Sequence, residues 1–364
     1  LHLKNLHLTN FRSYEKLDLE ITPGINIFVG KNGEGKTNIV EAIIFLTFLN
    51  SHRVANVQPL IKLGQETAYI RSKVSYPNRE LEIVLELNAQ KPNKATVNQN
   101  PVKSQKELFG LLQSIYFSPE DLDLVRGDSS LRRRFLDEFA ILKSPKIAAL
   151  TSDYEKAVKQ RNKLIKSRAN RESLQPWNEQ LSKIGGALIT TRISLINEIQ
   201  PFFVDTYQDI SGGSSAKLAY KSSISEPTTN TEANTEQLLT ALSNSYQQEI
   251  ERGFTLFGPH RDDLLLKLKD QPVKTYASHG ESWSIALALK LSLFQNIKKS
   301  GASPILILDD VFAELDDERR DHLLKIMEDV EQTLITCAVE NDIPKSISGK
   351  KYYVRTGFVS SYEV

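Results

Sequence analysis

Alternating apolar and polar positions predict that the chain begins as β-structure. Leucines alternate with polar residues over residues 1–9, and the alternation returns over residues 17–21 after a turn at 10–14. A period of two is typical of strands with one buried face, so these segments predict a hairpin. Residues 69–74 and 80–87 repeat the pattern, which predicts two more strands.

The region before residue 112 is therefore expected to be largely β. A short edge strand precedes a turn at residues 96–101, and an apolar run at residues 25–29 predicts a buried strand. The exception is residues 38–49, whose apolar positions have helical spacing.

From residue 118 onward the hydrophobic pattern becomes helical. Ser118 and Pro119 form a helix start, with Ser as N-cap and Pro at the first helical position. Residues 131–142, 147–169 and 177–199 then repeat apolar positions with a period near 3.6. This pattern predicts a helical lobe inserted into an α/β head.

The end of the lobe is less regular. A Ser/Gly segment at residues 211–215 and a Ser/Thr/Asn-rich run at residues 222–235 predict a mobile exposed loop. One more helix is expected at residues 238–252. These patterns divide the chain into a head, residues 1–117 and 254–364, and a lobe, residues 118–253.

Composition narrows the possible classes of protein. The 364 residues include 46 basic and 45 acidic side chains, so binding to nucleic acid would need a local basic patch. The single cysteine, Cys337, lies in an apolar run and is expected to be a small core residue. Without a signal-peptide pattern or a run of 18 apolar residues, a cytoplasmic protein with no membrane partner is expected.

Candidate chemistry begins at residues 30–37, which match the pattern G-x-x-x-x-G-K-[ST] between a strand and a helix. Glycines let backbone amides approach phosphate oxygens, and the helix adds its positive N-terminal end. Lys36 would reach the β- and γ-phosphates, and Thr37 would hold Mg²⁺. The alternative is a Gly-rich turn before a helix. The expected nucleotide contacts are Gly30, Lys31, Asn32, Gly33, Glu34, Gly35, Lys36, Thr37 and Asn38.

A second motif, residues 304–310, is an apolar strand that ends in two carboxylates. This is what an ATPase needs opposite a phosphate loop, with Asp309 for the metal and Asp310 to activate water. The alternative is a strand that ends in a solvated acidic turn. Together the two motifs predict ATP and Mg²⁺ as cofactors.

Ser278 and Gly280 open an apolar helix, residues 283–297, just before the acidic strand. Phosphate loop, helical insertion, Ser-x-Gly helix start and acidic strand occur in the order typical of ATP-binding-cassette heads. In such heads Ser-x-Gly meets the γ-phosphate of a nucleotide held by the other protomer. Ser278 is accordingly a candidate catalytic residue in trans, with an ordinary N-cap as the alternative.

The sequence also resembles the RecF family of recombination mediators, which is related to the heads of structural-maintenance-of-chromosomes proteins. The segments that carry the resemblance are residues 8–14, 30–38, 51–53, 117–122, Gly127, 132–137, 160–162, 258–264 and 308–316. The resemblance implies an ATP-dependent homodimer that binds double-stranded and gapped DNA. It also implies RecO and RecR partners, a weak DNA-stimulated ATPase, and roles in recombinational repair, replication restart and the response to DNA damage.

The chain departs from the family pattern at several positions. His279 stands where the family commonly has Gln, and Trp283 is likewise unusual in the signature segment. Many relatives have Glu where Asp310 stands, so a shorter acid suggests slow hydrolysis. Arg12 is a candidate nucleotide contact, and the alternative is an exposed partner of nearby acids. Arg53 has the same two interpretations, and the roles of Arg261 and Asp262 stay open.

A run rich in lysine and arginine between Lys156 and Arg171 contains no acid. Lys156, Lys159, Lys163 and Lys166 recur at intervals of three and four, so they share one helix face. The alternatives are a solvated face and a surface for DNA phosphates. Because no aromatic residue interrupts the run, base stacking is not expected there.

Three functions compete at this point. The first is an ATP-gated DNA clamp with ATPase activity, and the second is a binding module that uses ATP as structural glue. The third is the ATPase subunit of a transporter, although residues 334–339 lack the His that transport ATPases place after the acidic strand.

Overall fold

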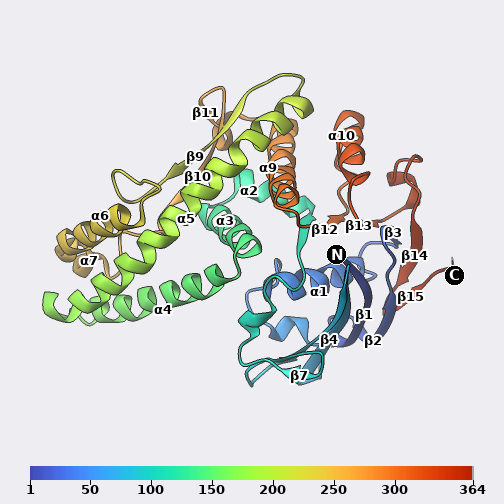
Figure 1. Cartoon of the computed structure of the whole chain (residues 1–364), viewed down its shortest axis with the longest axis horizontal. Coiled ribbons are helices and arrows are strands. Elements are labelled where there is room, and N and C mark those ends of the chain that lie inside the picture. Colours follow the sequence, from blue (N-terminus) through green and yellow to red (C-terminus); the bar gives the residue numbers. More distant parts are fainter. Residues whose placement is uncertain (363–364) are drawn as a thin grey trace. The chain divides into compact units, whose positions relative to one another are not determined.

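The computed structural model describes residues 1–362, which form two compact units. The first unit joins Leu1–Asp121 to the part of the chain that begins at Leu293, and the second unit is Leu122–Ser292. The first contains the blue and red ends of the chain, and the second contains its green and yellow middle (Figure 1).

An antiparallel sheet of six strands forms part of the first unit, in the order β2-β1-β4-β5-β6-β7. β1 pairs with β2 in antiparallel register, which confirms the predicted hairpin. One face carries buried leucines and isoleucines, as the alternation predicted. The strands are β1 (His2–Phe11), β2 (Tyr14–Glu20), β4 (Thr67–Tyr76), β5 (Arg79–Asn88), β6 (Lys94–Val97) and β7 (Asn100–Pro101).

The second sheet of this unit has the order β15-β14-β3-β13-β12-β8. All neighbours are parallel except β14 and β15, and the central strands β3, β12 and β13 are largely buried, as expected of a sheet covered on both faces. Cys337 is buried at the end of β13, as expected. The strands are β3 (Gly24–Val29), β8 (Ser114–Phe117), β12 (Ile305–Asp309), β13 (Gln332–Cys337), β14 (Lys350–Arg355) and β15 (Phe358–Ser360).

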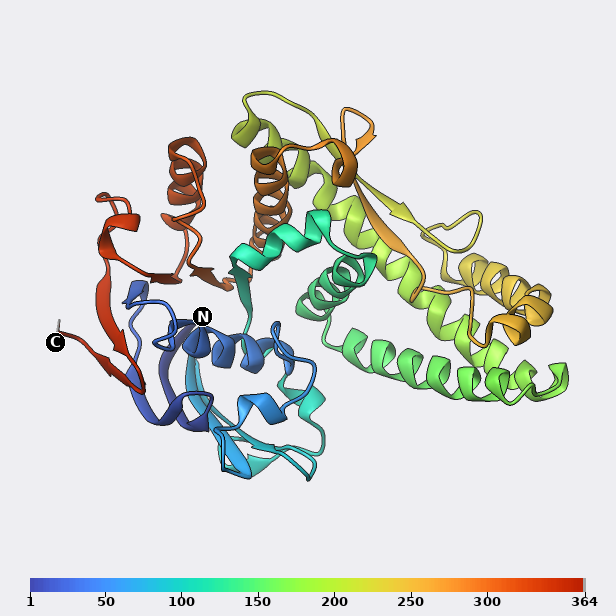
Figure 2. The same ribbon diagram turned by 180° about the vertical axis from the view of Figure 1, so that it is seen from behind.

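Helix α1 (Lys36–Phe48) follows β3 directly and confirms the strand–loop–helix prediction. Apolar side chains are buried all around it, and it contacts β8 and β12 of the second sheet. Seen from behind, it runs across the blue strands of the antiparallel sheet (Figure 2). α10 (Asp317–Met327) connects β12 to β13.

Helices dominate the second unit. α4 and α5 lie side by side in both views (Figure 1 and Figure 2), and the buried faces of α4, α5 and α6 form a shared apolar core. The helices are α2 (Leu122–Arg126), α3 (Ser129–Lys143), α4 (Lys146–Lys166), α5 (Arg171–Ser211), α6 (Thr231–Asn244), α7 (Tyr246–Arg252), α8 (Val273–Tyr276) and α9 (His279–Lys299), whose last residues belong to the first unit.

Several features of this unit differ from the sequence-based expectation. A three-stranded sheet, β11-β10-β9, pairs β9 (Ala216–Lys221) with β10 (Asp263–Leu268) and β10 with β11 (Gln271–Pro272). This pairing ties the chain after residue 253 to the helices. The second unit consequently extends to Ser292, whereas the sequence placed the end of the lobe at residue 253.

The expectation of an exposed loop over residues 222–235 is wrong in its second half. α6 begins at Thr231, and Asn234 is fully buried, where its amide donates to Thr228 O and Thr190 Oγ1. Asn230 caps the helix by accepting from the amide of Ala233. The polar residues that indicated a loop are the capping and buried hydrogen-bonding groups of a helix.

Candidate functional site

The phosphate loop lies between the end of β3 and the start of α1. Gly35 has a φ of +112°, and a Cβ there would come within 2.8 Å of Tyr14 Oη. A Cβ on Gly30 would meet Val354 O at 2.4 Å. Both positions therefore require glycine, which keeps backbone amides accessible at the N-terminus of α1.

The Lys36 side chain is 3% exposed and folds over this loop. Its Nζ donates to Gly30 O at 2.7 Å and to Lys31 O at 3.4 Å, and it lies 4.0 Å from Asp310 Oδ2. Glu34 stabilises the loop from the other end, since its Oε2 accepts from the amide of Lys31 at 2.8 Å. The loop thus holds a cation beside amides in the arrangement that phosphate requires.

The two sequence motifs meet at Asp309. Thr37 Oγ1 donates to Asp309 Oδ1 at 3.4 Å, and Thr336 Oγ1 donates to the same oxygen at 2.5 Å. β12 and β3 are both parallel neighbours of β13, so their carboxyl ends lie at the same edge of the sheet. Burial raises the pKa of Asp309 to about 6, because a desolvated position disfavours the charged carboxylate.

Asp310, the next residue, points a second carboxylate at the loop. Its φ is +53°, and its amide donates to Thr336 Oγ1 at 3.0 Å, which fixes this left-handed turn at the strand end. Burial raises the pKa of Asp310, while Lys36 opposes that shift. A raised pKa brings a carboxylate closer to the range in which it can accept a proton from water.

These groups fit Mg²⁺ bound together with a nucleotide. Within residues 1–362 no group of three or more His, Cys, Asp or Glu side chains could hold a metal ion. A hydroxyl from Thr37 and one carboxylate, Asp309, match the way Mg²⁺ is usually held by a few protein oxygens plus phosphates and water.

Arg12 and Arg53 surround a buried acid on α1. Arg12 donates to both oxygens of Glu41, at 2.8 and 2.7 Å, and its third nitrogen donates to Pro59 O at 2.8 Å. Arg53 Nη1 lies 3.6 Å from Glu41 and 3.4 Å from Asn38 Oδ1. The geometry favours the alternative in which Arg12 is the partner of an acid, and it holds α1 against β1.

Ser278 and Gly280 belong to the second unit, at the start of α9. Ser278 Oγ accepts from the amide of Glu281 at 3.2 Å, and Glu281 Oε2 accepts from the amide of Ser278 at 2.8 Å, which lowers the pKa of Glu281. This is a capping box, the contact that an N-cap serine makes. The Ser278 hydroxyl hydrogen is still able to donate. Trp283 and His279, the two unusual residues of this segment, contact each other: Trp283 Nε1 donates a hydrogen bond to His279 Nε2 at 3.2 Å.

The lysine face of α4 is exposed, but its members differ. Lys156 pairs with Asp153 at 3.4 Å, one turn outside the run. Lys159, Lys163 and Lys166 form no ion pair within the described residues 1–362. Arg161 of the same run is fully buried and bonds Glu249 at 2.6 Å, so it is structural. Exposed lysines without acidic partners are free to contact phosphates.

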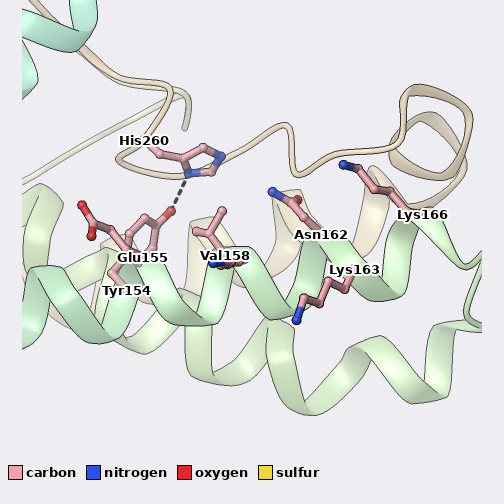
Figure 3. Close-up of a pocket in the computed structure, with 8 residues that line it drawn as sticks. Tyr154, Glu155, Val158, Asn162, Lys163, Lys166 and His260 are labelled. Atoms are coloured by element: carbon pink, nitrogen blue, oxygen red, sulfur yellow. Dashed lines mark hydrogen bonds between the residues drawn. The ribbon is translucent and has the colours of Figure 1, made fainter. Parts of the chain in front are cut away.

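A groove of about 470 Å³ runs beside these lysines (Figure 3). His260, from the turn between α7 and β10, lies across it from α4, and Tyr154 Oη donates to His260 Nδ1 at 2.8 Å. Asn162 lines the same groove. The sequence did not predict these three residues as possible ligand contacts. The available signals were the 258–264 motif and the four-residue spacing of Tyr154, Val158 and Asn162 along α4.

The same turn answers the question about Arg261 and Asp262. Arg261 donates twice to Thr255 O, at 3.0 and 2.8 Å, and its guanidinium lies over the Phe254 ring. Asp262 is 1% exposed and accepts from Tyr220 Oη at 2.5 Å, and burial raises its pKa. Both residues therefore have structural contacts: Arg261 bonds within the turn, and Asp262 holds the turn against β9.

A family comparison covers almost the whole chain. The model described as "RecF/RecN/SMC N terminal domain" matches residues 2–355. The DNA replication and repair protein RecF of Streptomyces avermitilis is 43% identical over 370 residues, which cover 99% of this chain and 99% of that protein.

Solved structures agree with this match and confirm the predicted α/β head with an inserted lobe. The recombination mediator protein RecF-ATP of the RecFOR pathway has a TM-score of 0.90 and 28% identity, over 98% of this chain and 96% of that one. A RecF-ATPrS structure gives the same TM-score and identity. The Smc head domain of Pyrococcus furiosus has a TM-score of 0.57 at 18% identity over 98% and 95%, a likeness of fold. No helix among the described residues is long and apolar enough to span a bilayer.

Proposed function

Because the chain belongs to the RecF family of DNA replication and repair proteins, we propose that it is an ATP-dependent recombination mediator that dimerises on ATP and binds double-stranded DNA near single-strand gaps. Its partners would be RecO- and RecR-type mediators in the cytoplasm. Relatives in the RecFOR pathway that were solved with ATP support the nucleotide part of this proposal.

The observation that carries the proposal is the meeting of the phosphate loop with the acidic strand end. Lys36 would bind the β- and γ-phosphates, and Thr37 and Asp309 would hold Mg²⁺. Bound Mg²⁺ supplies neutralisation of phosphate charge. Asp310, 4.0 Å from Lys36, would orient a water and take up its proton.

The proposal includes slow turnover, which the same geometry would favour. Asp310 is one methylene shorter than Glu, and its backbone amide donates a hydrogen bond to Thr336 Oγ1 that fixes the turn carrying the side chain. A short, fixed carboxylate reaches a water in fewer orientations, so fewer encounters are productive. Ser278 would donate its hydroxyl to the γ-phosphate of the partner protomer's nucleotide, together with the amide of Gly280.

Two substitutions test these assignments. Lys36→Ala should abolish tight ATP binding, because it removes the cation nearest the phosphates. Asp310→Asn keeps the shape of the side chain, so it should retain binding, block turnover and accumulate as an ATP-bound dimer. Nucleotide binding, hydrolysis and dimer formation are measured for both variants. Near-normal hydrolysis by Asp310→Asn would reject its assignment as the water-activating acid.

The main competing function is a binding module that uses ATP as structural glue. Single-turnover hydrolysis with and without duplex DNA separates the two. A gap-acting ATPase should hydrolyse faster with DNA, whereas a DNA effect on binding without any effect on hydrolysis would favour the module. Membership of the RecF family argues against the third alternative, the ATPase subunit of a transporter.

A further inference from the structure

The groove beside α4 combines an aromatic ring with free cations, which the lysine run alone does not provide. It has a volume of about 470 Å³, and Lys159 is among its lining residues. Val158 of α4 lies on one side of it and His260 on the other (Figure 3). Successive bases of single strands are commonly held by such pairs of ring and cation.

The His260 ring is fixed and neutral. Tyr154 Oη donates to Nδ1 at 2.8 Å, and Nε2 lies 3.2 Å from Thr255 O, to which it donates. These bonds assign the hydrogen to Nε2. Burial lowers the pKa of His260 to about 4. Because both nitrogens are used, what the ring offers a ligand in the groove is its flat surface.

Asn162 offers a hydrogen-bond donor beside that ring. Its Oδ1 accepts from the amide and the hydroxyl of Thr255, both at 2.7 Å. Its Nδ2 has no hydrogen-bond partner in the part of the chain that the structure describes, and Figure 3 shows it on the side of the groove that faces His260. All four bases carry acceptors on their edges, so this amide could bond any of them.

The two ends of the groove carry opposite charges. Lys166 lies at one end and Glu155 at the other, with His260 on the Glu155 side (Figure 3). A phosphate would be attracted to the lysine end and repelled from the carboxylate end. A ligand with a heterocycle joined to a phosphate therefore fits in one orientation.

We propose that this groove binds one unpaired nucleotide of a DNA strand where it leaves the duplex. The base lies against His260 and accepts from Asn162, and its phosphates lie near Lys163 and Lys166. This proposal rests on the proposed function, because it assigns the lysine face to DNA. It adds a means of distinguishing a junction from an uninterrupted duplex.

The test compares three DNAs by fluorescence anisotropy: a flush duplex, the same duplex with one unpaired nucleotide, and that duplex with an abasic nucleotide instead. The native chain should bind the unpaired nucleotide about five-fold or more tightly than the other two, as one stacked base contributes. Val158→Trp fills the groove and should remove this preference while keeping flush-duplex affinity. Val204→Trp, a partly buried valine of α5 that does not line the groove, should keep the preference.

Equal affinity of the native chain for the unpaired and abasic DNAs would overturn the proposal, and so would a preference that survives Val158→Trp. If Val158→Trp does not fold, Asn162→Asp replaces it, since it keeps the acceptor for Thr255 and removes the donor. The proposed function is tested separately, by the salt dependence of flush-duplex binding. A salt slope that responds to the lysines without any base preference would reject the groove alone.

Discussion

At the scale of single residues, Gly258 fixes the turn that forms one side of the groove. Its φ is +127°, and a Cβ there would come within 2.1 Å of Tyr154 Oη. The backbone of the turn therefore rests directly on the hydroxyl that orients His260. A side chain at this position has to displace the ring, the turn or both.

Gly258→Ala is expected to destabilise the chain by about 2–4 kcal/mol, from positive φ and from the clash. In a Tyr154→Phe background the clash is reduced, so the same substitution should cost at least about 1 kcal/mol less. Urea unfolding of the four chains measures both costs. Equal costs in the two backgrounds would mean that the Tyr154 contact contributes nothing.

His260 makes stability depend on pH. Its pKa of about 4 in the folded chain lies below the ordinary 6.5, so the unfolded chain binds more protons between those values. The contribution is present above pH 6.5 and is lost as the pH falls toward 4. Between pH 7 and pH 4.5 the native chain should lose roughly 2 kcal/mol more than His260→Gln.

Urea unfolding of both chains at the two pH values measures that difference. The carboxylates that titrate in the same range are present in both chains, so their effect cancels in the comparison. Parallel losses in the two chains would show that His260 is not held neutral.

Arg161 shows what local pattern cannot reveal about a residue. The sequence places it inside a basic run with the character of a DNA surface, yet it is fully buried against Glu249, Asn178 and Thr255. Its partners come from 17 to 94 positions away. The phosphate loop was predictable because its glycines, Lys36 and Thr37 act within eight consecutive positions. The groove was not, because His260 lies 106 positions from Tyr154.

At the scale of elements, α4 uses its two faces for different purposes. Tyr154, Ala157, Arg161 and Ile165 are buried, while the lysines at 159, 163 and 166 are exposed. The buried face fixes the helix, so changes on the lysine face should alter binding more than folding.

Changing Lys159, Lys163 and Lys166 together to Ala should weaken duplex binding alike on all sequences. Each lost phosphate contact flattens the slope of log K against log salt by ~0.9. A control with the same change in net charge replaces Lys91, Lys94 and Lys103 of the first unit by Ala. If both variants keep the native slope, the lysine face of α4 is only a solvated face.

The elements that sequence patterns predicted poorly depend on contacts from distant parts of the chain. α5 runs through Pro176 and Pro201, where a sequence pattern places helix ends. Buried Phe203 and Tyr207 hold the turns after Pro201 in place. β9 was missed since its six residues are a strand only when paired with β10. Long amphipathic helices and alternating strands near the N-terminus carried their own signal and were predicted.

At the scale of the whole molecule, the proposed nucleotide sites are shared between two copies of the chain. Lys36 of one protomer and Ser278 of the other would then flank the same γ-phosphate. Lys36→Ala and Ser278→Arg should each disable both sites of a homodimer. In a mixed dimer one site has both changes and the other has neither.

Mixing the two variants should therefore restore ATP-dependent association or partial hydrolysis, measured against each variant alone. Each variant is first shown to be folded by its thermal unfolding. A mixture that still does not associate on ATP would count against shared sites, because every site within a single chain would carry a change.

The position of β3 in its sheet also sets an order of events during synthesis. Its two neighbours, β13 and β14, lie more than 300 residues later in the chain, whereas the second unit is one continuous segment. The lobe can fold as soon as it leaves the ribosome. β3, the strand before the phosphate loop, cannot pair in its sheet until β13 and β14 have been synthesised. Nascent or prematurely terminated chains that lack these strands are thus expected to lack a formed nucleotide site, so the proposed ATP-dependent association would begin only after β13 and β14 have been synthesised.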